Sequence, residues 1–185
     1  TITAASGCIS TGTTNVLVNA LPQPTATSNS PVCLNKAINF TALGGNTYTW
    51  TGPNSFTTST QNPTIPTASL VNAGPYILWT TNGNGCTNSV QIVVVVNPLP
   101  VVVVNNPVTC VGSTFTLTAV TGTAFAWTGP NAYNSPVQNP SFANAQTTHS
   151  GNYTVIVTSA QGCTNSAVAG VTVITNPTVT VAGTN

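Results

Sequence analysis

The sequence of 185 residues predicts an all-β protein made of tandem β-sandwich domains, and three observations lead to that prediction. First, the sequence WTGPN at 50–54 returns at 127–131, an offset of 77 residues, so a domain-sized segment occurs twice. Second, short runs rich in Val and Thr alternate with clusters of Gly, Pro and Asn, which is typical of strands joined by turns. Third, no segment shows a helical hydrophobic period with a capped start.

The repeat accounts for almost the whole sequence. The same offset carries Cys33 to Cys110, QNP at 61–63 to 138–140, and GCTNS at 85–89 to 162–166. We therefore expect one full repeat at 25–99 and a second at 100–176. The remainder at 1–24 is similar to the end of a preceding repeat, and 177–185 is similar to the start of a following one. The sequence is thus expected to be a window of a longer array.

Each repeat is expected to contain about seven strands, the number found in a small β-sandwich. The expected strands are 25–28, 38–43, 47–51, 56–60, 64–68, 76–81 and 87–96 in the first full repeat, and 101–105, 115–119, 124–128, 133–137, 141–145, 153–158 and 164–173 in the second. The dipeptide NG at 82–83 predicts a two-residue hairpin turn between the last two strands of the first repeat. The sequence NPLP at 97–100 predicts a short extended linker.

The near absence of charge excludes several functions. There is no Asp or Glu, Lys36 is the only Lys or Arg, and His149 is the only His, so charged residues make up 1% against a usual ~25%. A protein that binds nucleic acids or anionic membranes requires basic patches. A pair of acid and base catalysts, a Ser-His-Asp triad and a calcium site all require carboxylate side chains. We expect no enzyme, no cofactor, no metal and no membrane span in this sequence, since it also lacks a long apolar run.

Several motifs resemble those of a known fold. INFTA at 38–42, Trp50, NPTI at 62–65 and NAGPYIL at 72–78 resemble the B, C, E and F strand signatures of an immunoglobulin (Ig) domain, and the second repeat matches them in the same order. The order VC, WTGPN, G-x-Y and GCT is similar to the Ig-like repeats of large secreted surface and adhesion proteins of Bacteroidota, exported by the type IX system. The resemblance implies tandem Ig-like sandwiches in an extracellular or cell-surface protein.

The sequence also departs from an ordinary Ig domain. Where the B and F strands would carry the usual intersheet cysteines, this sequence has Ala42 with Leu78, and Ala119 with Val155. The core is therefore expected to depend on packing around large aromatic side chains. These are Trp50, Trp127, Tyr76 and Tyr153.

All five cysteines are disulfide candidates, with two alternative pairings. The equal spacing of 53 residues from Cys33 to Cys86 and from Cys110 to Cys163 suggests one bridge within each repeat. The Ig topology implied by the resemblance places Cys33 and Cys86 at opposite ends of a domain about 20 Å long, too far apart for a bridge. It favours a bridge between domains, Cys33–Cys163, and by the same rule Cys86 would bridge back to the preceding domain and Cys110 forward to the following one. Cys8 is assigned to a preceding repeat, because SGC at 6–8 is similar to the GC corner at 85–86. Free thiols are the third alternative.

Two features suggest an interaction surface. Strand alternation turns Tyr76 and Leu78 inward and Trp79 outward, where an aromatic side chain can anchor an interface or stack on a sugar. The valine runs at 93–96 and 101–104 are apolar at consecutive positions, so one of their faces must meet a neighbour or solvent. The interface candidates are Trp79, Val94, Val96, Val101 and Val103.

These features predict a structural segment of an extracellular fibre, stalk or surface layer. Its expected partners are further copies of the repeat, held by uncharged apolar faces and disulfides. The alternative is a cell-surface adhesin that binds glycans through Trp79 or through the loops at 50–56 and 127–133.

Overall fold

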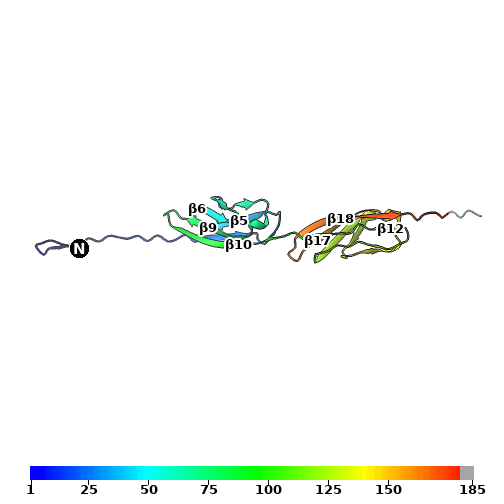
Figure 1. The fold of residues 1–185 in the computed structure, drawn as a ribbon. Helices are drawn as coiled ribbons and strands as arrows, with labels where there is room; N and C mark the ends of the chain where they lie inside the picture. Colours follow the sequence, from blue (N-terminus) through cyan, green and yellow to red (C-terminus); the bar gives the residue numbers. More distant parts are fainter. Residues whose placement is uncertain (180–185) are drawn as a thin grey trace, which may run out of the picture. The chain divides into compact units, whose positions relative to one another are not determined.

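A computed structural model describes residues 1–179, which form two compact units (Figure 1). The first unit contains Thr1–Ser30, Ile38–Ile65 and Val71–Val94; the second contains Pro31–Ala37, Pro66–Leu70 and the chain from Val95 onward. The units therefore do not coincide with the sequence repeats, because three short segments of the first repeat, Pro31–Ala37, Pro66–Leu70 and 95–99, belong to the second unit. Most of the expected start of a following repeat at 177–185 lies outside the described residues.

The first unit is an antiparallel β-sandwich. Its strands are β3 (Thr25–Ser28), β5 (Ile38–Leu43), β6 (Thr47–Gly52), β7 (Phe56–Thr58), β8 (Thr64–Ile65), β9 (Gly74–Thr81) and β10 (Thr87–Val94), with the short 3-10 helix η1 (Leu70–Asn72) before β9. They form a 4-stranded sheet in the order β10-β9-β6-β7 and a 3-stranded sheet in the order β3-β5-β8. A separate hairpin pairs β1 (Ile2–Thr3) with β2 (Ile9–Ser10).

The second unit has a larger main sheet. Its strands are β4 (Val32–Cys33), β11 (Val96–Asn97), β12 (Val108–Cys110), β13 (Phe115–Thr116), β14 (Ala124–Gly129), β15 (Tyr133–Ser135), β16 (Ser141–Phe142), β17 (Gly151–Thr158) and β18 (Thr164–Ile174), and its 3-10 helices are η2 (Pro130–Ala132) and η3 (Thr147–His149). The main sheet has the order β12-β18-β17-β14-β15, and β13 pairs with β16. Two short pairings, β11 with β4 and β12 with β18, are parallel.

The fold is all-β and built from Ig-like β-sandwiches, which confirms the predicted fold class. In each repeat a buried tyrosine near the start of β9 or β17 donates a hydrogen bond to a backbone carbonyl four residues upstream. The Tyr76 hydroxyl reaches the Asn72 carbonyl at 2.9 Å, and the Tyr153 hydroxyl reaches the His149 carbonyl at 3.1 Å. This tyrosine corner is a hallmark of Ig-like sandwiches.

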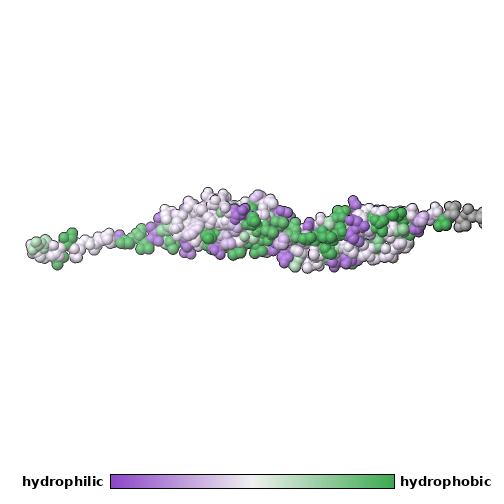
Figure 2. All heavy atoms as spheres, viewed as in Figure 1, coloured by the Kyte–Doolittle hydropathy of each residue, from purple (hydrophilic) through white to green (hydrophobic). Residues whose placement is uncertain are grey.

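Aromatic side chains fill both cores. In the first unit the Phe40 ring lies 5.2 Å from Trp50 and 4.7 Å from Tyr76, measured between ring centroids. In the second unit Trp127 and Tyr153 are buried together with apolar residues of the sheets. Apolar residues also reach the surface, as the green spheres among white and purple ones in Figure 2 show.

The repeated WTGPN motif is explained by its contacts. The Trp50 indole Nε1 donates to the Gln61 carbonyl, and Trp127 does the same to Gln138, both at 3.1 Å. A Cβ on Gly52 would lie 2.4 Å from the Tyr76 ring, so only glycine leaves room for that ring beside the backbone. Gly129 has the same relation to Tyr153, also at 2.4 Å. The motif therefore connects the core tryptophan to the tyrosine corner.

The repeated QNP motif hydrogen-bonds to the backbone of one buried alanine in each repeat. The Gln61 side-chain amide donates to the Ala42 carbonyl at 2.8 Å, and the Asn62 side-chain oxygen accepts from the Ala42 amide at 2.9 Å. Gln138 and Asn139 make the same bonds to Ala119, at 2.8 and 3.1 Å. Both side chains thus replace a strand partner for one buried residue.

Some expected elements differ in the structure. The segment at 101–105 is not a strand; it contributes only one bridge, between Val104 and Ala119. The turn after β9 is not the two-residue NG turn, because Thr81 pairs with Thr87 and the loop spans residues 82–86. In that loop Gly85, with a φ of 80°, adopts the left-handed conformation that favours glycine.

Candidate interaction surface

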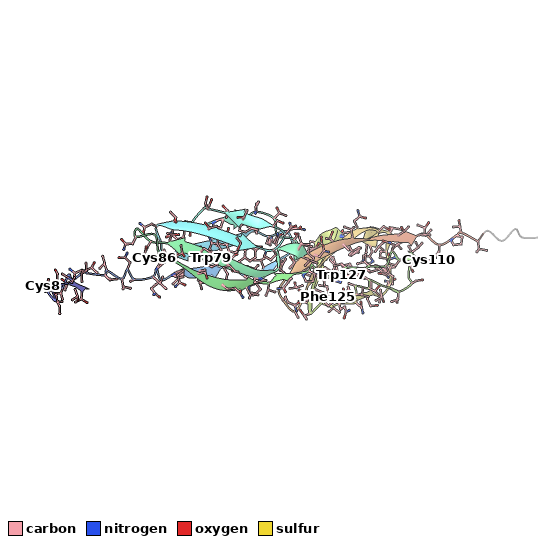
Figure 3. All side chains as sticks on the ribbon, turned by 60° about the vertical axis from the view of Figure 1, so that its left-hand side comes forward. Cys8, Trp79, Cys86, Cys110, Phe125 and Trp127 are labelled. Atoms are coloured by element: carbon pink, nitrogen blue, oxygen red, sulfur yellow. A yellow bond between two sulfur atoms is a disulfide. The ribbon has the colours of Figure 1, made fainter. Side chains whose placement is uncertain are left out.

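Trp79 lies on β9, an inner strand of the first unit's main sheet (Figure 3). On β9 the flanking Leu78 and Thr80 are buried, whereas 48% of the Trp79 side chain is exposed. Its neighbours across the sheet are Thr49 on β6 and Ser89 on β10, both exposed. A large aromatic ring is therefore presented on the sheet surface among small uncharged side chains.

The second unit presents an equivalent face. Ile156 takes the place of Trp79 on β17, and it is also 48% exposed. Its neighbours in register are Ala126 on β14 and Ser166 on β18, both exposed and uncharged. Each sandwich thus carries one large apolar side chain at the same place on its outer sheet. We call these two surfaces, centred on Trp79 and Ile156, the outer sheet faces.

The assignment of Val94 and Val96 to an interface was wrong. Val94 and Val96 are only 1% and 6% exposed, so they belong to the core. The exposed members of this run are Val93 at 61% and Val95 at 47%. A run of identical apolar residues carries no alternation, so the sequence could not show which face of the strand points inward.

Val101 and Val103 are exposed in the second unit, at 70% and 56%. Their backbone carbonyls are held by the loop before β14, since the Thr121 hydroxyl donates to Val101 and the Val120 amide donates to Val103 at 3.2 Å. The two side chains are thus fixed on an ordered segment and remain open to a neighbour.

The aromatic loops proposed as sugar platforms do not present their rings. Trp50 and Trp127 are 0% and 1% exposed. Phe56 packs against Tyr76 at 5.4 Å between ring centroids, and Tyr133 packs against Phe142 at 4.7 Å. Trp50 and Trp127 belong to the cores and Phe56 and Tyr133 pack against those cores, so Trp79 is the candidate that combines a tryptophan ring with wide exposure.

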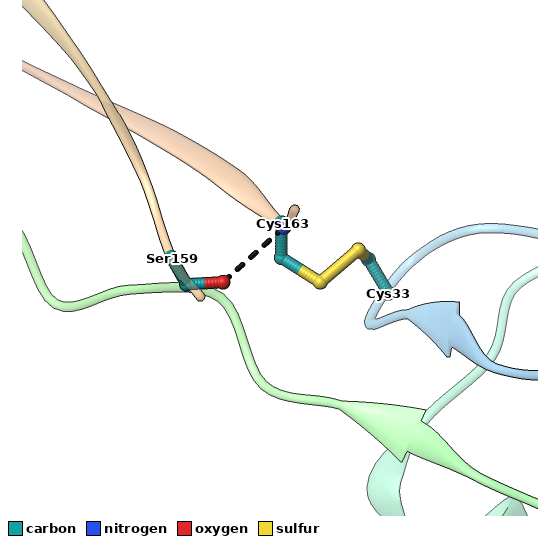
Figure 4. The surroundings of a disulfide bond; sticks show 3 residues. All are labelled: Cys33, Ser159 and Cys163. Atoms are coloured by element: carbon teal, nitrogen blue, oxygen red, sulfur yellow. Dashed lines mark hydrogen bonds between the residues drawn. A yellow bond between two sulfur atoms is a disulfide. The ribbon is translucent and has the colours of Figure 1, made fainter. Parts of the chain in front are cut away.

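The structure contains the disulfide Cys33–Cys163 (Figure 4). The two Cα atoms are 5.6 Å apart, and the cysteines are separated by 130 residues in the sequence. Cys33 belongs to the first sequence repeat and Cys163 to the second, although both lie in the second compact unit. The alternative pairings Cys33–Cys86 and Cys110–Cys163 are not formed, because each uses one cysteine of this bridge. Cys8, Cys86 and Cys110 are free thiols in the structure.

The described residues offer no cluster of His and Cys that could hold a metal ion. His149 serves a local structural role: its Nδ1 accepts a hydrogen bond from the Gln146 amide at 3.1 Å, as part of a capping box around η3. Burial raises the pKa of Tyr76, and burial followed by the nearby Tyr133 raises the pKa of Tyr153. Both phenols are therefore held in the neutral form that donates to the backbone. No helix within residues 1–179 is long and apolar enough to cross a bilayer.

A shallow depression of about 270 Å³ lies beside β14 and β15. It is lined by Ala126, Trp127, Thr128, Asn134, Ser135 and Pro136. None of these side chains is ionisable at neutral pH, and no side chain in the depression can act as an acid or base there.

No protein-family model and no curated protein matches the sequence. Among solved structures, the chain is similar to three N-terminal domains of the Highly Immunogenic Outer Capsid protein of bacteriophage RB49, with a TM-score of 0.44 and 18% identity, over 83% of this chain and 59% of that one. Murine CEACAM1b gives a TM-score of 0.39 and 12% identity, over 82% and 100% of the two chains. Eight N-terminal Ig domains of the Down Syndrome Cell Adhesion Molecule give 0.49 and 14%, over 83% and 25%.

Proposed function

We propose that this chain is a structural segment of an extracellular fibre, stalk or surface layer built from tandem Ig-like repeats. Its partner is a second copy of the same repeat, which associates through the outer sheet faces centred on Trp79 and Ile156. Disulfides provide additional covalent cohesion. The observation that carries the proposal is the exposure of a large apolar side chain at the same position of both sandwiches.

The composition of these faces supports association between copies. Two identical surfaces with net charge repel each other, whereas two uncharged surfaces carry no such penalty. Lys36 is the only Lys or Arg in the chain and there are no carboxylate side chains, so no long-range repulsion opposes the contact. A soluble monomer normally carries net charge that keeps its copies apart. A chain without that protection is suited to an assembled state.

The proposed extracellular location rests on two features. The chain contains a disulfide, and such bonds persist in oxidising environments outside the cytosol. The motif order is also similar to that of the secreted Bacteroidota surface repeats. The proposal assigns no catalytic role to the chain.

Sedimentation velocity over a range of concentrations tests the role of the outer sheet faces. We expect the chain to self-associate, and the double variant Trp79→Ser, Ile156→Ser to raise the dissociation constant by at least about tenfold, as expected for loss of a central apolar anchor. The matched control is Leu70→Ser, which removes an equally exposed apolar side chain, at 53%, from η1 instead of a sheet. It should leave the association unchanged.

Salt gives an independent check. At about 1 M NaCl the Debye length falls to about 3 Å, so an assembly held by ion pairs would dissociate. An assembly held by apolar faces should persist. Dissociation in high salt, or an unchanged dissociation constant for the double variant, would contradict the proposal.

An adhesin that binds glycans is the second candidate. Trp79 favours it, because a half-exposed indole beside the hydroxyls of Thr49 and Ser89 could stack on a sugar ring and donate hydrogen bonds to it. A glycan array tests this role. Binding that is lost in Trp79→Ala and kept in Ile156→Ala would support it, and an array without any bound glycan would remove it.

A further inference from the structure

The bridged cysteine Cys163 lies in a turn that occurs again at two free thiols. In this turn the Ser159 amide donates to the Cys163 carbonyl at 2.8 Å, and the Gly162 amide donates back to the Ser159 carbonyl at 2.9 Å. The Ser159 hydroxyl also accepts from the Cys163 amide at 3.2 Å (Figure 4). Gly162 has a φ of 79°, which closes the turn.

The turn around Cys86 repeats this geometry bond for bond. The Asn82 amide donates to the Cys86 carbonyl at 3.0 Å, and the Gly85 amide donates to the Asn82 carbonyl at 3.1 Å. The Asn82 side-chain oxygen replaces the Ser159 hydroxyl and accepts from the Cys86 amide at 3.0 Å. Gly85 has a φ of 80°.

The β1–β2 hairpin contains a third copy of the turn. The Ala4 amide donates to the Cys8 carbonyl and the Gly7 amide donates to the Ala4 carbonyl, both at 2.9 Å. Gly7 has a φ of 81°. We call Cys8, Cys86 and Cys163 the turn cysteines.

The other bridged residue, Cys33, also has a structural twin. Cys33 ends β4 and pairs in parallel with Asn97, while Cys110 ends β12 and pairs in parallel with Ile174, which is the equivalent position. The carbonyls of Cys33 and Cys110 each accept a hydrogen bond from the amide three residues on, both at 3.1 Å. We call Cys33 and Cys110 the strand cysteines.

The one disulfide in the structure joins a strand cysteine to the turn cysteine of the next sequence repeat. We propose that this pairing is a general rule: Cys110 bonds to the turn cysteine of another copy of the repeat, and Cys86 and Cys8 bond to strand cysteines of other copies. Each free thiol is therefore a cysteine whose bridging partner lies in another copy of the repeat. The support is that each occupies the backbone conformation in which its equivalent is bridged, which a lone exposed cysteine would not require.

The chemistry of the step is thiol–disulfide exchange with a low-molecular-weight disulfide. The thiolate of Cys110 attacks that disulfide and releases one small thiol. The turn cysteine then attacks the mixed disulfide, forms the protein S–S bond and releases the second small thiol. Two protein thiols lose two electrons and two protons, and the small disulfide gains them as two thiols.

The rule has a mechanical consequence. The bridged cysteines are 130 residues apart, whereas the repeat offset is 77 residues. Loops closed by successive bridges would therefore overlap, and every peptide bond in the overlapping region would lie inside at least one closed loop. Cleavage of a single peptide bond would leave the array covalently continuous.

Disulfide mapping in a glutathione redox buffer tests the rule on two chains. The first is the chain of 185 residues, in which no following copy of the repeat supplies a turn cysteine for Cys110, and the second is residues 1–176 followed by a further copy of 100–176. Free thiols are alkylated and the bridges are identified in non-reduced peptides. We expect Cys33–Cys163 in both chains, and Cys110 joined to Cys163 of the added copy in the extended chain.

Comparing the two chains shows whether the cysteine that bonds to Cys110 comes from another molecule or from the same one. Linkage of Cys110 to Cys8 or Cys86 in covalent dimers of the shorter chain indicates bridging between molecules, and linkage to the added copy in monomers of the extended chain indicates bridging along one molecule. In Cys110→Ser, Cys163 of the added copy should become alkylated. A reduced Cys110 in the extended chain with Cys33–Cys163 formed, or a Cys110–Cys110 bond, would overturn the rule. The inference builds on the proposed array, but its failure would leave association in the sedimentation experiment unchanged.

Discussion

The side chain of Thr80 lowers the stability of the sandwich in which it is buried. Thr80 is 1% exposed, and its hydroxyl has no hydrogen-bond partner. The equivalent residue of the second repeat is Val157, which is 0% exposed and has nearly the same shape. A buried hydroxyl without a partner lowers stability, because it loses its hydrogen bonds to water and gains none in return.

We predict opposite effects for the two exchanges at this position. Thr80→Val should raise the free energy of unfolding by about 1–2 kcal/mol, and Val157→Thr should lower it by a similar amount. Denaturant unfolding of both variants measures this. A stability unchanged by either exchange would mean that the hydroxyl finds a partner in solution.

At the level of the strand, the valine run preceding NPLP determines how the end of the first repeat is buried. Val94 is 1% exposed and Val93 is 61% exposed, although the two residues are identical and adjacent. The structure therefore predicts very different sensitivity to the same change. The sequence alone predicts no such difference between the two positions, because every residue in the run is valine.

Val94→Thr should lower the free energy of unfolding by about 1–3 kcal/mol, since it buries a hydroxyl without altering the size of the side chain. Val93→Thr is the matched control and should change stability by less than about 0.5 kcal/mol. Thermal unfolding of the two variants side by side checks the prediction. Equal losses would show that Val93 is also buried, for example by an associated copy.

The strand pattern was largely predictable from sequence, and its exceptions have physical causes. Strands with clear alternation, such as β5 and β9, occupy the expected positions within two residues. The parallel strands β4 and β12 were missed, because each has only a few residues and depends on a partner far away in the chain. The turn at 82–86 was misassigned because Asn-Gly signals a turn without fixing its length.

For the whole molecule, the lack of carboxylates determines the response to pH. Acid unfolding of ordinary proteins comes mainly from carboxylates with a lower pKa in the folded than in the unfolded state, and this chain has no Asp or Glu. Tyr76 and Tyr153 affect stability at alkaline pH. Burial raises the pKa of both in the folded state, so their contribution to stability is complete below the usual tyrosine pKa of about 10.

We predict a free energy of unfolding that stays nearly constant between about pH 4 and pH 9 and falls as pH rises above about 10. The unfolded chain releases the two phenolic protons at a lower pH than the folded chain, which favours unfolding at alkaline pH. Urea unfolding across this range measures the profile. The double variant Tyr76→Phe, Tyr153→Phe should show a smaller alkaline decline, and a steep loss of stability near pH 4 would contradict the prediction.

The disulfide can be tested on the whole chain because Lys36 is the only trypsin site. Cleavage after Lys36 in the denatured, non-reduced protein separates Cys33 from the rest of the chain. We expect the two fragments to remain joined on a non-reducing gel and to separate on a reducing gel. With Cys8 replaced by serine so that Cys33 is the one cysteine of the small fragment, Cys163→Ser should release that fragment even without reductant, whereas Cys86→Ser should not. Release by Cys86→Ser would indicate the pairing within the repeat instead.

The sequence by itself determined the repeat, the β-sandwich class, the uncharged surface and the outward direction of Trp79, because these follow from local pattern and composition. Only the tertiary structure decided which valines are buried and which cysteine bonds to Cys33. A uniform apolar run does not specify a face, and the distance between cysteines 130 residues apart depends on the path of the chain. The same holds for Gly52 and Gly129, whose necessity appears only once a tyrosine ring from a distant strand packs against each of them.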